Sequence, residues 1–169
     1  EKVVTPFPYF ASFGCCLLWV IYAGSDLPRM LQGFIINAIG LVLHTSFILC
    51  YWAFVKDKKH CAKLVGMVAW ALAHVLCLCN TKQIGNFACL LNIIMYYSPL
   101  TAAGEAIRTK AVDKFPVKPL VMTLIGSASW FAFGCLINDM PIIIPNFLGI
   151  IFGIVQLGIY FGIELKYIV

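Results

Sequence analysis

The chain has 169 residues, of which 62% are hydrophobic and only 11% are charged, whereas an ordinary soluble domain carries about 25% charged residues. This composition is typical of a protein that spans a lipid bilayer, and it excludes an ordinary soluble domain. The formal net charge is +5, but the cations lie in short links between apolar segments and form no basic face with stacking aromatics. The sequence therefore predicts the lipid bilayer as a partner, and no nucleic acid.

Six apolar segments follow one another along the chain, and each has about the 20 residues that a helix needs to cross a bilayer. None shows the alternating polarity of a transmembrane strand of about 10 residues. The chain is therefore expected to be an all-α membrane protein. The predicted helices cover residues 8–24, 30–55, 64–81, 83–107, 117–138 and 140–164.

The positive charges predict an orientation in the membrane. If the first helix runs outward, ten Lys and Arg residues face one side, and only Arg29 and Lys82 face the other. Lys and Arg are enriched in cytoplasmic loops. The N-terminal end of this sequence and the C-terminus are thus expected in the cytosol, with the plasma membrane or an internal membrane as the location.

Two halves of the chain carry the same polar residues at nearly the same spacing. The pattern Asn-x-x-Gly occurs at residues 37–40 and again at residues 146–149, which is 109 residues later. Ahead of these motifs, Trp19 and Trp130 are 111 residues apart, and each is followed three residues later by another aromatic side chain. The sequence therefore predicts an internal repeat with small insertions.

Repeats that face the same way across a membrane need an odd number of helices. We therefore expect two parallel three-helix-bundle repeats joined by a linker helix. Residues 1–59 would form the first repeat without its first helix, 60–82 the linker, and 83–169 the second repeat. By this count six of seven transmembrane helices are present, and the first helix is absent.

Several motifs resemble those of the SWEET sugar transporters, over nearly the whole chain. They are "PYFASFGCCLLWVIYAG", "YYSPL", "RTKAVDKFP", "SWFAFG" and "NDMPIIIPNFLG". The resemblance implies a facilitative, bidirectional sugar uniporter that works by alternating access around a central site. The bulk of Trp19 favours a monosaccharide such as glucose.

Asn37 and Asn146 are the first candidates for binding the sugar. An amide without partners in hydrocarbon costs roughly 2 to 7 kcal/mol, so both side chains need a partner or a cavity. A single Asn in such a segment would be expected to form a hydrogen bond between helices. The symmetric placement of two favours a substrate site that both side chains share. An amide can donate to and accept from sugar hydroxyls. By resemblance, Trp19 and Trp130 line the same pocket, where an indole can cover an apolar sugar face.

The resemblance also implies moving parts. Pro8, Pro99 and Pro116 match prolines on the cytosolic side of the family, where a missing backbone hydrogen bond would let a helix bend. A proline tolerated at a helix start is the alternative for Pro8 and Pro116. Tyr22 and Asp139 match residues that close an extracellular gate, although both could simply be solvated.

Other functions stay open at this point. The same architecture serves amino-acid exporters with a Pro-Gln pair at the helix kinks, and a non-transporting membrane receptor is a third class. An enzyme has little support, because no paired nucleophile and base appears. No cofactor is expected, and the eight cysteines show no zinc-ligand spacing. His44 could relay protons, but a uniporter is the prediction; a homo-oligomer is possible.

Overall fold

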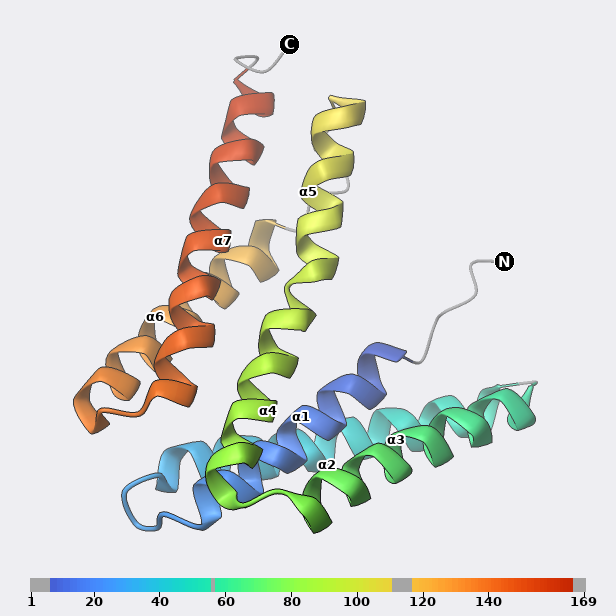
Figure 1. Cartoon of the computed structure of the whole chain (residues 1–169). Helices are drawn as coiled ribbons and strands as arrows, with labels where there is room; N and C mark the ends of the chain where they lie inside the picture. The colour runs from blue at the N-terminus through green and yellow to red at the C-terminus, as the bar shows by residue number, and fades with distance from the viewer. Residues whose placement is uncertain (1–6, 56, 111–116, 166–169) are drawn as a thin grey trace. The chain divides into compact units, whose positions relative to one another are not determined.

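The computed structural model describes residues 7–55, 57–110 and 117–165, and the regular structure in these ranges is helical. Five of the helices are long and apolar enough to cross a membrane. Figure 1 shows the helices in chain order. Their bounds are α1 Phe7–Gly24, α2 Leu31–Phe54, α3 Lys58–Leu78, α4 Thr81–Met95, α5 Tyr97–Thr109, α6 Val117–Ile137 and α7 Met140–Glu164. The chain is thus an all-helical membrane protein, as its composition predicts.

Four predicted helices lie where the hydropathy places them. The bounds of α1, α2, α6 and α7 differ from the prediction by one residue at most. Within a bilayer every backbone N–H and C=O group must be bonded inside the segment, and a continuous helix achieves this. Helix α3 differs more, since it begins at Lys58 rather than at residue 64. Helical hydrogen bonds are local, so the helix continues through lysines that no apolar window would include.

The prediction of one continuous helix over residues 83–107 is wrong. The structure divides it into α4 and α5, which have 15 and 13 residues and are separated by Tyr96. Pro99 has no backbone N–H, so it cannot bond to the carbonyl of Met95, four residues earlier, where α4 ends. The described residues thus form seven helices rather than six. The absence of a first helix, expected from the repeat count, is not supported by this structure.

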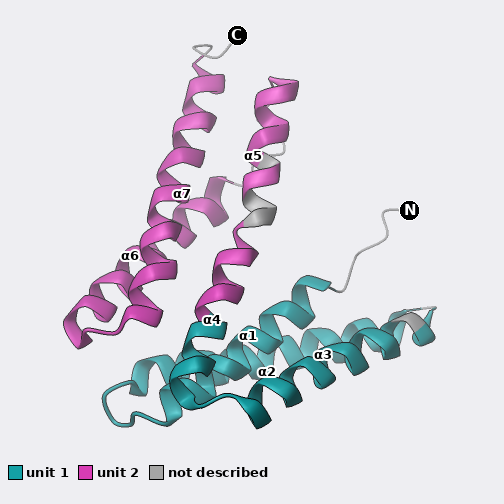
Figure 2. Cartoon of the chain, in the orientation of Figure 1, with its two compact units in different colours: residues 1–88 teal, residues 89–169 magenta. Residues whose placement is uncertain are grey.

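The chain divides into two compact units, Glu1–Ala88 and Cys89–Val169, shown in different colours in Figure 2. In the first unit α1 packs along α2 and also contacts α3. In the second, α7 packs along α6 and contacts α5, around a small buried core of Ala103, Ala106, Leu120 and Ile163. The boundary between the units falls inside α4. The predicted division into two repeats and a linker stays a prediction.

A two-residue turn joins α6 to α7. Asn138 has a positive φ of 54°, and the N–H of Asp139 donates to the carbonyl of Gly134 at 2.9 Å. This is the bonding of a left-handed helix C-cap, in which Asn is one of the residues that adopt positive φ at low cost. The short turn makes α6 and α7 neighbours in the second unit.

Candidate functional site

The two repeated asparagines have the same local geometry. Asn37 is the seventh residue of α2, and Asn146 is the seventh residue of α7. Each Nδ2 donates to the carbonyl four residues earlier, at 2.8 Å to Gly33 and at 2.7 Å to Ile142. Both side chains are half-buried. The backbone bond satisfies one donor of each amide, and the other N–H and the Oδ1 atom are the groups that could bind a ligand.

The glycines of the two motifs lie at close helix contacts. A Cβ atom on Gly40 would lie 2.8 Å from the Sγ atom of Cys16 on α1. A Cβ atom on Gly149 would lie 2.5 Å from the Oγ atom of Ser127 on α6, and it would also collide with the hydroxyl end of the Tyr96 side chain. Cys16 and Ser127 are 111 residues apart, the spacing of the two tryptophans. The repeat thus includes a pair of helix contacts that the motif comparison missed, although this spacing would have revealed them.

Each of the two tryptophans packs against an aromatic side chain three residues later. The ring of Trp19 meets that of Tyr22 edge-to-face, with centroids 5.8 Å apart, and Trp130 meets Phe133 at 5.6 Å. Trp19 is buried, with 8% of its surface exposed, whereas Trp130 is half-buried. The broad indole faces are therefore held in place by a neighbour one turn later on the same helix.

The three predicted hinges have different surroundings. Pro99 is the third residue of α5, and this helix begins directly after the break at Tyr96. Pro8 is the second residue of α1, a first-turn position where a helix needs no N–H from the residue. Pro116 lies outside the described residues. A helix break thus accompanies Pro99, while Pro8 has the geometry of a helix start.

The two predicted gate residues have structural partners in their own units. Asp139 is 5% exposed and caps α7, since its Oδ1 accepts from the N–H of Ile142 at 3.2 Å. The ring of Tyr22 lies directly over the backbone of Gly85 in α4. Both residues therefore contribute to helix packing or capping, and a gate between them stays a prediction.

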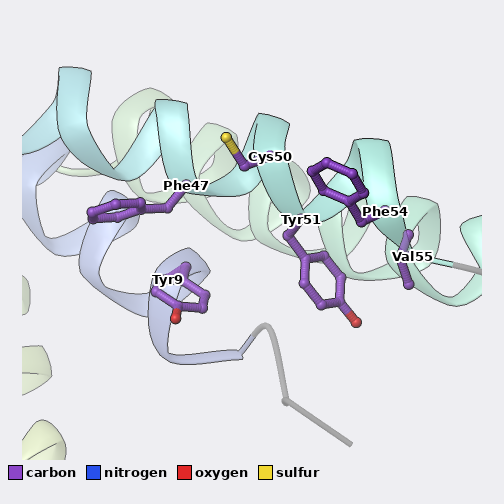
Figure 3. A pocket seen from close by; sticks show the side chains of 6 residues that line it. All are labelled: Tyr9, Phe47, Cys50, Tyr51, Phe54 and Val55. Atoms are coloured by element: carbon purple, nitrogen blue, oxygen red, sulfur yellow. The ribbon is translucent and has the colours of Figure 1, made fainter.

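Two cavities of the first unit are lined by residues other than the predicted sugar-binding side chains. A cavity of about 360 Å³ opens between α1 and the second half of α2 (Figure 3). Its lining is largely aromatic and consists of Tyr9, Phe47, Cys50, Tyr51, Phe54 and Val55. A second cavity of about 200 Å³, between α1, α2 and α3, is lined almost wholly by apolar side chains. Neither lining includes Asn37 or Trp19, so these cavities lack the amide groups expected of a sugar site.

Comparison with known proteins connects this geometry to a family. Residues 82–166 match the family described as sugar efflux transporters for intercellular exchange. The chain is also 32% identical over 168 residues to the bidirectional sugar transporter SWEET5 of Arabidopsis thaliana, covering 92% of this chain and 70% of that protein. The chain belongs to the SWEET family.

Other members of the SWEET family agree with this assignment. The bidirectional sugar transporter SWEET7b of Oryza sativa subsp. japonica is 31% identical over 167 residues, which cover 90% of this chain and 62% of the rice protein. The solved structure of a eukaryotic SWEET transporter superposes with a TM-score of 0.84 at 27% identity, over 97% of this chain and 81% of that one. The chain therefore spans about three fifths of the length of the rice relative.

Membership in the SWEET family narrows the functions that the sequence leaves open. The family is one of membrane transporters, so the enzyme reading is excluded. The relatives are named for sugar transport.

Proposed function

We propose that this chain is a facilitative, bidirectional sugar uniporter that binds a monosaccharide such as glucose. The observation that carries the proposal is the repeated amide. Asn37 and Asn146 occupy equivalent positions on α2 and α7 and make the same bond to their own helices. Two equivalent amides with free hydrogen-bonding groups suit a neutral polyol, whose hydroxyls both donate and accept.

Trp19 and Trp130 complete the proposed site. Each indole can cover the apolar C–H face of a sugar ring at little conformational cost, and each is held by an aromatic neighbour. We expect the bulk of Trp19 to narrow the site to a single sugar ring. Alternating access would carry the site from one side of the membrane to the other.

The moving parts of the proposal follow the resemblance to the family. Pro99 is the best supported hinge, because α4 ends four residues before it. Pro8 and Pro116 are assigned as hinges by motif alone. Tyr22 and Asp139 would close the extracellular side, with both chain ends in the cytosol.

Uptake into proteoliposomes tests the proposal. The chain should carry labelled glucose down its gradient, and Asn37→Ala and Asn146→Ala should each abolish sugar binding. Their melting temperatures should stay close to the parent, because each amide bonds to a carbonyl of its own helix, and even a bond between helices contributes only about 0.6 kcal/mol on average. Full transport by either variant would contradict the assignment of these asparagines to the sugar site. Failure of the parent protein to transport any hexose would refute the proposed function.

A further inference from the structure

Tyr96 connects three helices of the second unit at the level of Asn146. It is the single residue between α4 and α5, and its hydroxyl donates a 3.2 Å hydrogen bond to the carbonyl of Pro145 on α7. Its ring meets Phe152 edge-to-face, with centroids 5.7 Å apart. The hydroxyl end of the same side chain lies against Gly149, where α7 also meets Ser127 of α6. The side chain is therefore half-buried in the packing of α7.

The carbonyl that accepts this bond lies in the peptide unit between Pro145 and Asn146, the residue proposed to bind the sugar. The carbonyl of Pro145 and the nitrogen of Asn146 form one rigid plane. A donor that fixes the direction of this carbonyl therefore also fixes the backbone from which the Asn146 side chain projects. Pro145 lies inside α7, and its nitrogen cannot donate to the carbonyl four residues earlier. Local helical support is therefore weaker here, and a bond from another helix has more effect.

We propose that Tyr96 is a positioning residue for sugar binding. Its hydroxyl holds the peptide between Pro145 and Asn146, so that the free groups of the Asn146 amide are presented in one orientation. Tyr96 acts through Asn146 and does not itself contact the sugar. The inference rests on the proposed function, in which Asn146 binds the substrate. It adds the α4–α5 break to the sugar site, because the hydroxyl comes from the residue at that break.

The substitution Tyr96→Phe removes the hydroxyl and keeps the ring with its edge-to-face contact to Phe152. We expect labelled glucose to bind roughly two- to tenfold more weakly, the effect of losing one hydrogen bond. The melting temperature should stay close to the parent because the ring packing is retained. Tyr51→Phe, the same change on α2, should leave glucose affinity unchanged. Parent-like affinity of Tyr96→Phe would overturn the inference.

A double-mutant cycle separates positioning from a general loss of structure. Asn146→Ser and Asn37→Ser each shorten the amide to a hydroxyl, and both should retain weak glucose binding. The effect of Tyr96→Phe should shrink in the Asn146→Ser background and persist in the Asn37→Ser background. Equal effects in both backgrounds would contradict an action through Asn146.

A spectroscopic measurement distinguishes failure of this inference from failure of the proposed function. With ¹³C at the carbonyl of Pro145, Tyr96→Phe should move the carbonyl resonance, and Tyr51→Phe should not. An unmoved resonance would overturn the inference whatever the sugar data. If the resonance moves but the parent protein binds no glucose, the proposed function fails, and the role in sugar binding falls with it.

Discussion

A hydrogen bond within its own helix reduces the free-energy cost of placing each repeated asparagine in an apolar segment. One N–H of Asn37 and one of Asn146 bond to carbonyls of their own helices. Such bonds are available to any short polar side chain within a helix, so the amide tolerates hydrocarbon without an obligatory partner on another helix. The remaining groups can then bind and release a ligand without leaving the side chain wholly unsatisfied.

The glycine that follows each asparagine has a packing role that can be tested. Gly149→Ala would place a methyl group 2.5 Å from the Ser127 Oγ atom and against the hydroxyl end of the Tyr96 side chain. Overpacking of this kind typically costs about 1 to 3 kcal/mol, so the melting temperature in detergent should fall. Gly66→Ala is the matched control, since nothing lies within 4 Å of its Cβ position. The packing role would be refuted if Gly149→Ala melted no lower than Gly66→Ala.

At the scale of helices, the break between α4 and α5 distinguishes this segment from the long helices on either side. The two pieces have 15 and 13 residues, each shorter than the roughly 20 that span a bilayer. The N–H of Tyr96 still donates to the carbonyl of Ile93, and the carbonyl of Tyr96 accepts from the N–H of Leu100. The chain therefore continues through the break with hydrogen bonds on both sides of one weak point.

Restoring an N–H at residue 99 should strengthen this weak point. In Pro99→Ala the new N–H can donate to the carbonyl of Met95, and we expect α4 and α5 to join. If the break serves alternating access, glucose transport should slow while glucose affinity changes less than about twofold, since the substitution does not touch the proposed ligands. Helicity by circular dichroism should not fall.

Pro119→Ala provides the control. Pro119 is the third residue of α6, just as Pro99 is the third residue of α5, but it does not lie at the break between α4 and α5. Its replacement should leave the transport rate unchanged. Transport by Pro99→Ala at the parent rate would show that the break is not a hinge.

At the scale of the whole chain, the acidic residues that the structure describes lie away from the middle of the membrane helices. The described acids lie between helices or near helix ends; they are Asp26, Asp57, Glu105, Asp139 and Glu164. Coupled transporters place ionisable residues within the membrane. His44 is a titratable side chain well inside α2, and its buried Nδ1 atom has no hydrogen-bond partner among the described residues. Its counterpart in the second repeat is Gly153, so the repeat does not reproduce this group.

We therefore predict transport that follows the sugar gradient alone. Net glucose uptake into proteoliposomes should reach equilibrium and no further, with or without an imposed pH gradient. Counterflow should likewise be insensitive to that gradient. Accumulation above equilibrium that is driven by protons and lost on His44→Ala would overturn the uniport prediction.

By itself, the sequence determined the fold class, the bounds of most helices and the family. Hydropathy is sufficient for the fold class and the helix bounds because a bilayer admits only segments that bond their own backbone, whereas the family resemblance rests on short motifs. It also placed Asn37 and Asn146 in equivalent surroundings, since a repeat is visible as residue spacing. These predictions depend on local or periodic features of the chain.

Only the tertiary structure decided which side chains meet. It divided the predicted helix at Tyr96, assigned Asp139 to the cap of α7, and placed Tyr96 on the carbonyl of Pro145. The partners in this last contact are 49 residues apart, and no periodicity links them. Contacts between distant residues depend on how helices pack, and hydropathy does not encode that packing because many different side chains are equally apolar.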